Sequence, residues 1–379
     1  MLRIALYHDF LVNMGGAERV AENLHRTLPD SDLYTTMTAA GRLSPYFKEV
    51  QPKTSWMQML PAKSKLFRHY FLLYPFAVEM ANLKEYDLIV SSCFGYAKGV
   101  KRGKSAVHVC YCHNPMRWVW RTTDYLASEP LGRLKHALIR FALKPLRAWE
   151  MRAARRPDYY IANSAVVAKR LYEAFGVHAT VIPPPIETKR FHPCSYVDDY
   201  FLVLSRLAPY KRLDLAVQAC SQLGLPLIVI GDGPDRKRLE KMAGPTVTFL
   251  GRLPDAVVDR YARQCRALIF PGEEDFGMTP LEINAAGRPV VGYRGGGALE
   301  TIRDGVNGLF FTEQTVESLT DALQRFDSMT WDPIAIRRHA ERFDTSVFQE
   351  RIIDFLVKVM PDFGEEVVRF EDQKQGAAA

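Results

Sequence analysis

The sequence of 379 residues lacks an apolar run long enough to cross a membrane as a helix. The longest uncharged run of note, residues 215–231, is interrupted by glutamine, glycine and proline, so we interpret it as a helix, a turn and a strand. The first residues, MLRIALYHDF, lack the basic start and long apolar core of a signal peptide, and we expect a strand there. The sequence also contains no internal repeat and no low-complexity tract. These absences favour an ordinary globular protein.

Cysteine is scarce and badly spaced for metal or redox chemistry. The six cysteines are scattered, and Cys110 and Cys112 are separated by one residue, which fits neither a redox CxxC motif nor a zinc knuckle. We therefore expect reduced cysteines in the protein core, no metal site, and a cytoplasmic protein.

Acidic residues are scarce in the first half of the chain. Residues 1–190 carry 28 lysines and arginines against 15 acidic residues, whereas the remainder carries 22 against 28. A basic half beside an acidic half predicts that the first half faces an anionic partner, either nucleic acid or an anionic membrane surface.

Short apolar runs alternate with helical patterns along both halves. Runs such as YDLIVSSC and AVHVCYCH occur in the first half, and the pattern restarts with YFLVLSRL and LPLIVIGDG. This alternation is typical of parallel sheets covered by helices on both faces. The sequence therefore predicts an α/β protein with two Rossmann-like domains, residues 1–190 and 191–345, followed by a helix over 346–362 that packs back on the first domain.

Polar residues at the ends of the expected strands are candidates for function, because open α/β sheets bind ligands there. Gly15 and Gly16 precede a helix and form either an anion site or an ordinary turn. Arg206 and Lys211 follow the first strand of the second half, where they either bind a pyrophosphate or lie solvated at the surface. His113 follows another strand and is either a structural hydrogen-bonding residue or a proton-transfer group.

The stretch EEDFGMTPLE, residues 273–282, places acid, glycine and proline where a strand gives way to a helix. Residues 277–279 can present free backbone N–H groups, and Pro280 suits the first helical turn. An acidic loop that merely complements the helix dipole would explain residues 273–275 but not Glu282. Glu274 and Glu282 are therefore candidates for binding hydroxyl groups of one ligand.

Together these residues resemble the retaining glycosyltransferases of family 4, which have the GT-B fold. The resemblance extends over essentially the whole chain. Its main motif is a glutamate pair eight positions apart, Glu274 and Glu282, between ALIFPG and GRPVVGYRGGGALE. The segment YCHNPMRWVW is most similar to WbaZ-like mannosyltransferases of bacterial O-antigen and exopolysaccharide assembly.

The resemblance implies a role for each candidate in binding a nucleotide sugar. Glu282 would bind the ribose and Glu274 the donor sugar. The backbone amides near the sugar and the phosphates would be those of Phe276, Gly277, Met278 and Thr279.

The remaining implied contacts concern the diphosphate, the base and the acceptor. Arg206 and Lys211 would neutralise the diphosphate leaving group, helped by the amides of Gly15 and Gly16, while the backbone around Arg252 and Leu253 would meet the base. His113 would lie beside the sugar on the acceptor side. The candidate catalytic residues are thus Glu274, His113, Arg206 and Lys211.

The resemblance also implies a reaction, that of a hexosyltransferase that retains anomeric configuration by front-face attack. It uses no metal and no cofactor apart from its nucleotide-sugar donor, for which we expect GDP-mannose. A UDP-sugar or another GDP-sugar is the alternative.

Residues 132–156 form a strongly basic helical pattern with eight lysines and arginines, one acid (Glu150) and an apolar side that includes Phe141, Leu146 and Trp149. Such a helix is typical of a membrane-surface element, although an ordinary packed helix is the alternative. The expected membrane-facing residues are Arg133, Lys135, Arg140, Lys144 and Arg147. We expect a peripheral enzyme at the inner face of the cytoplasmic membrane with a lipid-linked saccharide acceptor, and not a nucleic-acid-binding protein, which is the rival interpretation of the basic charge.

Overall fold

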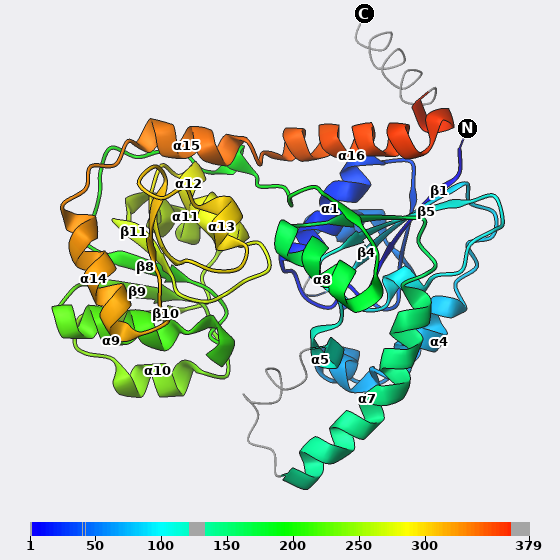
Figure 1. The fold of residues 1–379 in the computed structure, drawn as a ribbon, viewed down its shortest axis with the longest axis horizontal. Helices are drawn as coiled ribbons and strands as arrows, with labels where there is room; N and C mark the ends of the chain where they lie inside the picture. The colour runs from blue at the N-terminus through cyan, green and yellow to red at the C-terminus, as the bar shows by residue number, and fades with distance from the viewer. Residues whose placement is uncertain (1, 40, 42, 121–132, 365–379) are drawn as a thin grey trace, which may run out of the picture. The chain divides into compact units, whose positions relative to one another are not determined.

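The structure is a computed structural model that describes residues 2–39, 41, 43–120 and 133–364, with only the backbone of 133–140 and 142 (Figure 1). The chain divides into two compact units. The first comprises Met1–Pro183 and Phe348–Ala379, and the second comprises Pro184–Val347. The division falls after Pro183 rather than after residue 190 as expected.

Hydrogen bonds explain why residues 184–190 belong to the second unit. The backbone N–H of Ile186 donates to the carbonyl of Phe343 at 2.8 Å, and Arg337 Nη2 donates to the carbonyl of Thr188 at 3.3 Å. The proline-rich segment therefore passes into the second unit as soon as the last strand of the first unit has ended.

The described residues of the first unit form a parallel sheet with the strand order β3-β2-β1-β4-β5-β6-β7. Its strands are β1 (Ile4–His8), β2 (Asp32–Thr35), β3 (Lys53–Thr54), β4 (Leu88–Cys93), β5 (Val107–Cys112), β6 (Tyr159–Ala162) and β7 (Ala179–Val181). Strand β4 is buried along its whole length, as a central strand covered on both faces must be.

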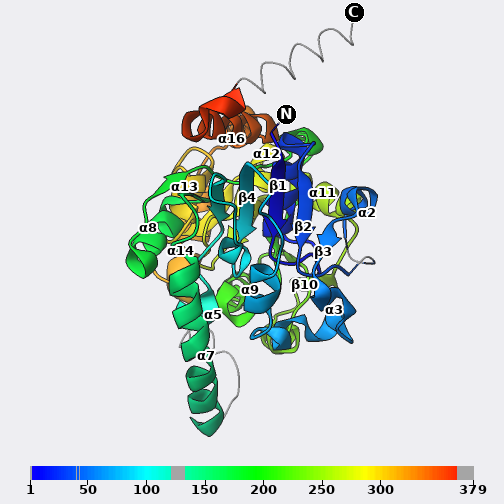
Figure 2. The same ribbon diagram turned by 90° about the vertical axis from the view of Figure 1, so that its right-hand side faces the viewer.

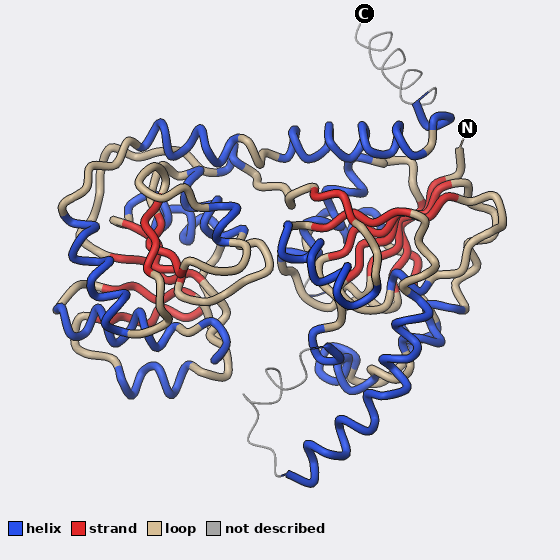
Figure 3. Tube along the Cα trace, in the orientation of Figure 1, coloured by secondary structure: helices blue, strands red, loops and turns tan. Residues whose placement is uncertain are grey.

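Helices cover both faces of this sheet, as Figure 3 shows. The helices are α1 (Gly16–Thr27), α2 (Pro45–Val50), η2 (Trp56–Met59), α3 (Lys63–Leu66), η3 (Phe67–Tyr70), α4 (Tyr74–Glu79), η4 (Ala97–Gly99), α5 (Arg117–Trp120), α7 (Arg133–Ala153), α8 (Ala165–Phe175) and, from Phe348 onward, α16 (Thr345–Val359). Residues Phe348 and Ile352 of α16 pack in one core cluster with Val20 and Leu24 of α1. Helix α7 runs outward from the unit toward its Arg133 end (Figures 1 and 2).

The described residues of the second unit form a second parallel sheet with the order β10-β9-β8-β11-β12-β13. Its strands are β8 (Phe201–Leu204), β9 (Leu227–Ile230), β10 (Val247–Gly251), β11 (Ala267–Phe270), β12 (Val290–Tyr293) and β13 (Gly308–Phe311). Its helices are η5 (Thr188–Arg190), η6 (Pro209–Lys211), α9 (Leu213–Leu223), α10 (Arg236–Met242), α11 (Asp255–Gln264), α12 (Met278–Ala285), α13 (Ala298–Thr301), α14 (Val316–Asp327) and α15 (Pro333–Glu341).

Each sheet therefore has the doubly wound arrangement that the sequence predicts, and the prediction of two Rossmann-like domains is confirmed. The strand order reverses between β1 and β4 in the first unit and between β8 and β11 in the second. Such a reversal opens a crevice at the carboxyl ends of the two strands, where ligands of this fold class bind. Within the described part of the chain, no helix has the length and apolar character needed to span a membrane.

Candidate functional site

The loops that follow β8 and β11 carry most of the predicted site in the second unit. These strands are neighbours, with Ala267 paired to Phe201 and Leu268 to Leu202. The loop after β8 holds Arg206 and ends in η6 with Lys211, and the loop after β11 holds Glu274 and leads into α12. The fold thus brings these predicted residues to the point where the strand order reverses.

Lys211 and Glu274 contact one another directly. The Lys211 ammonium forms an ion pair and hydrogen bond with Oε1 of Glu274, and the two side chains are 14% and 24% exposed. The sequence predicts separate tasks for them, at the phosphate and at the sugar. The structure instead joins them in one half-buried pair, so a ligand that binds either group also changes the surroundings of the other.

Arg206 lies on the same loop as Lys211 but is exposed. Its neighbours are fixed by backbone hydrogen bonds, from Ser205 N to the carbonyl of Ile230 at 3.1 Å and from Leu207 N to the carbonyl of Asp232 at 3.2 Å. Gly231 lies so close to this loop that a side chain there would overlap the Ser205 carbonyl. The loop is therefore held firmly while the Arg206 side chain reaches solvent.

The corner between β11 and α12 begins its helix at Met278, within the stretch where the sequence predicts a helix start. Gly277 before it has φ 92°, a left-handed conformation that a residue with a Cβ adopts only with strain. Phe276 is buried against Ile186, Leu281 and Phe343, so its side chain holds the corner in place and only its backbone is available to a ligand.

A glycine-rich loop after β12, which the sequence analysis did not single out, supports this corner. Gly297 donates its backbone N–H to the carbonyl of Glu274 at 2.8 Å. A side chain at Gly297 would overlap the backbone of Phe276, and one at Gly296 would overlap the Glu274 carbonyl. The run of glycines in YRGGGALE was the available signal, because glycine often marks places where two backbone segments approach closely.

Glu282 lies on α12, half-buried, in a second charged group. Arg190 forms a 2.6 Å ion pair with Asp259 of α11 and lies near Asp255 as well. Burial opposes the charge of Arg190, but its bond to Asp259 and the negative charges of Asp255 and Glu282 raise the pKa of its guanidinium. Arg190 thus bonds to α11 and feels the negative charge of Glu282, and it could not be identified from the sequence.

The predicted base-contacting residues follow β10. Arg252 is exposed, and Leu253 packs against the core cluster that also contains Tyr261. Gly251 before them accepts a backbone hydrogen bond from Gly231 at 2.8 Å. The loop after β10 therefore lies beside the loop after β9.

In the first unit, the predicted glycine pair meets a carboxylate of the chain itself. Helix α1 begins at Gly16 with Gly15 as its N-cap residue. The buried Glu18 accepts hydrogen bonds from the backbone N–H groups of Gly15 and Glu18, and burial raises the pKa of this carboxyl to about 7. Amides expected to bind an anionic ligand are thus partly engaged by Glu18, which sequence analysis did not identify.

His113 follows β5 and is buried, with Nε2 2.9 Å from Oγ of Ser92 on β4. The same hydroxyl lies 3.0 Å from Nδ1 of His8, the last residue of β1. His8 is fully buried, and this burial, together with the neighbouring His113, lowers its pKa to about 3. His8 and Ser92 were missed, because only the strand order brings them beside His113.

Asp9, the residue after His8, holds the loop after β4 in place. Its carboxylate accepts backbone N–H bonds from Phe94, Tyr96 and Ala97 at 2.7, 2.7 and 2.6 Å. Burial raises the pKa of Asp9, and these bonds together with Lys98 oppose that shift.

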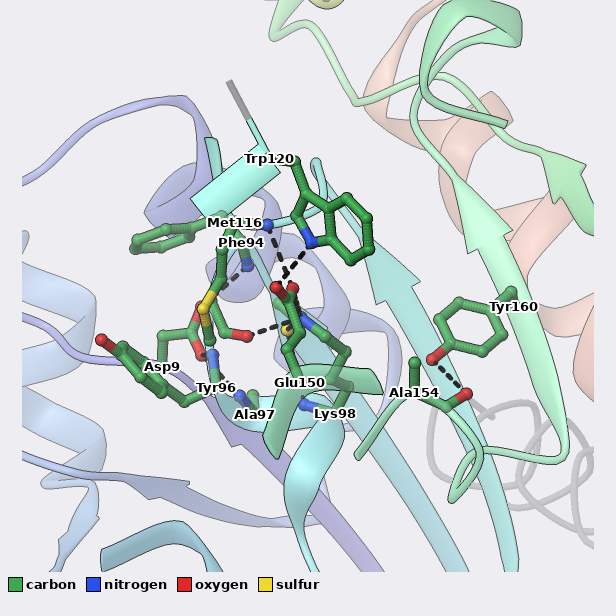
Figure 4. A network of polar contacts seen from close by, with 12 residues as sticks. Asp9, Phe94, Tyr96, Ala97, Lys98, Met116, Trp120, Glu150, Ala154 and Tyr160 are labelled. Atoms are coloured by element: carbon green, nitrogen blue, oxygen red, sulfur yellow. Dashed lines mark hydrogen bonds and ion pairs between the residues drawn. The ribbon is translucent and has the colours of Figure 1, made fainter. Parts of the chain in front are cut away.

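Helix α7 is tied to the same loop by a buried network (Figure 4). Glu150, the single acid of the basic segment, pairs with Lys98 and accepts hydrogen bonds from Met116 N at 3.1 Å and Trp120 Nε1 at 2.8 Å. Neither Lys98 nor Glu150 could be assigned a role from the sequence.

The structure corrects the prediction that Phe141, Leu146 and Trp149 form one apolar side of helix α7. Leu146 and Trp149 are buried in the core of the first unit, whereas Phe141 is 70% exposed. Lys144 and Arg147 are exposed, and the Arg147 guanidinium also stacks over the Trp120 ring. Arg133, Lys135 and Arg140 lie on the helix, but their side chains are outside the described atoms.

Among the described residues there is no group of three histidine, cysteine or acidic side chains able to hold a metal ion.

Two family models match consecutive parts of this chain. The model described as Glycosyltransferase Family 4 matches residues 14–190, and the model described as Glycosyl transferases group 1 matches residues 187–339. The first match contains Gly15, Gly16 and His113, and the second contains the remaining predicted contacts to the nucleotide sugar.

Individual proteins that are similar to this chain are also glycosyltransferases. A GDP-mannose-dependent alpha-(1-6)-phosphatidylinositol monomannoside mannosyltransferase of Mycobacterium tuberculosis is 32% identical over 192 residues, which is 42% of this chain and 50% of that protein. The match thus spans about half the length of this relative. The mouse alpha-1,3/1,6-mannosyltransferase ALG2 is 25% identical over 73% of this chain and 74% of its own.

Among solved structures, Anabaena HepE in complex with UDP and glucose superposes with a TM-score of 0.67 at 17% identity, over 94% of this chain and 99% of that one. At this identity the likeness shows the fold, which is the GT-B arrangement of two Rossmann-like domains.

Proposed function

We propose that this chain, which belongs to the family 4 and group 1 glycosyltransferases, transfers a sugar from a nucleotide-sugar donor to a lipid-linked saccharide. The observation that carries the proposal is the Lys211–Glu274 pair at the strand-order reversal of the second unit. A cation and a hydroxyl-binding carboxylate held together there suit a molecule in which a phosphate adjoins a sugar.

The reaction is a displacement at the anomeric carbon with retention of configuration. The bond from the anomeric carbon to the β-phosphate oxygen breaks, and the acceptor oxygen forms its bond on the same face. The acceptor's proton passes to the departing phosphate. Negative charge develops on that phosphate, so fixed positive charge beside it gives the largest help. Lys211 and Arg206 supply this charge.

Each remaining residue has a binding task. Glu274 accepts hydrogen bonds from the donor sugar and Glu282 from the ribose, while the backbone of residues 276–279 meets the sugar and phosphates. Arg252 and Leu253 lie beside the base. The first unit contributes the amides of Gly15 and Gly16 and, on the acceptor side, His113.

The donor we propose is GDP-mannose, supported by the mycobacterial relative whose name states dependence on it. UDP-glucose is the competing donor, since the Anabaena structure holds UDP and glucose in the same fold. The deciding experiment is a thermal-shift panel of GDP, UDP, GDP-mannose and UDP-glucose with the full chain. We expect GDP and GDP-mannose to raise the midpoint temperature of unfolding. If none of the four nucleotides raises it, the proposed function is contradicted.

The acceptor we propose is a lipid-linked saccharide of bacterial surface-polysaccharide synthesis, used at the cytoplasmic face of the membrane. Its support is the exposed basic and aromatic surface of α7, formed by Phe141, Lys144 and Arg147. Exposed cations beside an apolar side chain are typical of helices that bind anionic lipid surfaces.

A further inference from the structure

Three buried polar side chains form a continuous chain across the centre of the first sheet. His8 and Ser92 are paired residues of the adjacent strands β1 and β4, and His113 comes directly after the next strand, β5. The Ser92 hydroxyl lies 3.0 Å from Nδ1 of His8 and 2.9 Å from Nε2 of His113. His8 and Ser92 have no exposed surface, and His113 is 8% exposed.

A serine hydroxyl between two imidazoles links their protonation. The hydroxyl has one proton, and in the described part of the chain the two rings are its hydrogen-bond partners, so when that proton is used it donates to one ring and accepts from the other. Either His8 donates from Nδ1 and Ser92 donates onward to His113, or His113 donates from Nε2 and Ser92 donates to His8. The tautomer of one ring therefore fixes the tautomer of the other.

The surroundings of His8 select between these two arrangements. Its Nε2 has no hydrogen-bond partner among the described protein atoms. A buried N–H group without an acceptor is rarer in proteins than an acceptor without a donor. His8 should therefore keep its proton on Nδ1, where Ser92 accepts it. Ser92 then donates to Nε2 of His113, which leaves the proton of the neutral His113 ring on Nδ1.

We propose that His8 acts through Ser92 as a positioning residue for His113, holding the neutral ring with its proton on Nδ1. This rests on the proposed function in one respect, the place of His113 beside the donor sugar. With its proton on Nδ1, His113 acts as a hydrogen-bond donor toward any atom that this nitrogen contacts. His113 therefore orients oxygen atoms of the substrates and does not take the acceptor's proton, which agrees with a displacement in which the departing phosphate takes it.

The neutral state of His8 makes it suitable for this task. Burial and the adjacent His113 ring lower its pKa to about 3, so His8 stays neutral throughout the range in which the protein is expected to work. The Phe94 ring lies 5.8 Å from the His8 ring and belongs to the loop that Asp9 fixes. His8 is thus a constant donor held in rigid surroundings.

The chain contains a matched control for testing this inference. Ser91, the neighbour of Ser92 on β4, places its hydroxyl 2.9 Å from Nε2 of His108 on β5, and both residues are fully buried. Ser91→Ala therefore removes a hydroxyl from another buried serine–histidine pair in the same two strands. It should change the state of His108 and leave His113 as it is.

The experiment is two-bond ¹H–¹⁵N correlation NMR of the full chain labelled on its nine histidines, which identifies the protonated nitrogen of each ring. We expect His8 and His113 both to be protonated on Nδ1, and Ser92→Thr, which keeps a hydroxyl, to preserve this. Ser92→Ala should move His113 toward the Nε2-protonated form that free imidazole side chains prefer. An Nε2-protonated His113 in the wild type, or a His113 unaffected by Ser92→Ala, would overturn the proposal.

A turnover measurement with GDP-mannose separates this inference from the proposed function. Ser92→Ala should lower kcat by about tenfold or more, as loss of the correct tautomer does in other enzymes, while the KM for the donor stays within about twofold. Ser91→Ala should lower kcat much less. Equal losses in both variants would reduce the role of Ser92 to packing and overturn the positioning role. Absence of nucleotide stabilisation and turnover in the wild type would contradict the proposed function and leave the NMR result to decide the tautomer.

Discussion

Lys98 and Glu150 form an ion pair that is closed off from solvent on both sides. Lys98 Nζ lies 2.8 Å from Glu150 Oε1, and neither side chain has any exposed surface. Lys98 Nζ also donates to the carbonyl of Gly95 at 2.6 Å. The pair joins helix α7 to the loop after β4, whose backbone Asp9 holds, so the basic helix is anchored at the strand ends that carry His113.

When this pair is broken, the first unit should unfold at a markedly lower denaturant concentration. Lys98→Met leaves a buried carboxylate without its cation, and we expect a loss of about 3–5 kcal/mol in the free energy of unfolding. Urea denaturation followed by tryptophan fluorescence can report this, because Trp56, Trp118, Trp120 and Trp149 all lie in the first unit.

Two further variants make the test specific. Lys101→Met removes an exposed cation that pairs with the partly buried Glu79, and should cost about 1 kcal/mol or less. Lys98→Met combined with Glu150→Gln should cost less than Lys98→Met alone, because the neutral amide removes the unpaired buried charge and its single oxygen can still accept from either Met116 N or Trp120 Nε1. Equal losses for Lys98→Met and Lys101→Met would show that the buried pair has no special role.

Removal of the Lys211 cation should slow the transfer step. We expect Lys211→Ala to lower kcat by roughly 10²–10³-fold, because it removes fixed positive charge from the departing phosphate. Lys237→Ala removes an exposed lysine from α10 in the same unit and should have little effect. Steady-state rates with GDP-mannose measure both variants, and near-wild-type turnover of Lys211→Ala would remove Lys211 from the mechanism.

The two glutamates of the eight-residue motif should differ in what they bind. Glu282→Gln should weaken binding of bare GDP, whereas Glu274→Gln should weaken binding of GDP-mannose relative to GDP, because only Glu274 is assigned to the sugar. Calorimetric titration of each variant with both ligands measures the difference. Identical profiles for the two variants would contradict this division.

Much of the fold was predictable because it depends on local patterns. The apolar runs ending at His8, Cys93 and Phe270 are strands, and the corner at Gly277 starts a helix as its glycine and proline indicate. The prediction that Arg206, Lys211 and Glu274 lie at strand ends followed from the rule that parallel strands end at one edge of the sheet.

What the sequence concealed depends on strand order and on contacts between distant segments. His8 and Ser92 are 84 positions apart, and they meet only because β1 and β4 are neighbours in the sheet. Glu150 stands alone among basic residues, but its burial follows from packing of α7 against the loop that contains Lys98. Gly297 supports the Glu274 corner through a backbone contact that no spacing rule indicates.

Charge reversal on α7 should weaken binding to anionic membranes. Lys144→Glu with Arg147→Glu removes two exposed cations and adds two anions, and we expect roughly thirtyfold or greater loss of binding to vesicles containing phosphatidylserine. Lys104→Glu with Lys169→Glu makes the same charge change at exposed positions elsewhere in the first unit. Sedimentation with anionic and neutral vesicles compares them, and equal losses in the two double variants would show that net charge, and not the α7 surface, governs binding.

Neutralising Glu18 should stabilise the protein in a pH-dependent manner. Burial raises the pKa of this carboxyl from 4.5 to about 7 in the folded chain, so the folded state binds its proton more tightly than the unfolded state does. Below about pH 4.5 the carboxyl is protonated in the folded state, and its contribution to the free energy of unfolding is fully present. That contribution is lost as the pH rises through 7. Glu18→Gln, whose amide oxygen can still accept from Gly15, avoids this loss. Its free energy of unfolding should match the wild type near pH 4.5 and exceed it by up to about 3 kcal/mol at pH 8, measured by urea denaturation across that range. Groups other than Glu18 titrate in both proteins, so their contributions cancel in the difference between the two free energies of unfolding. If that difference does not change between pH 4.5 and 8, Glu18 is not a buried acid at the start of α1.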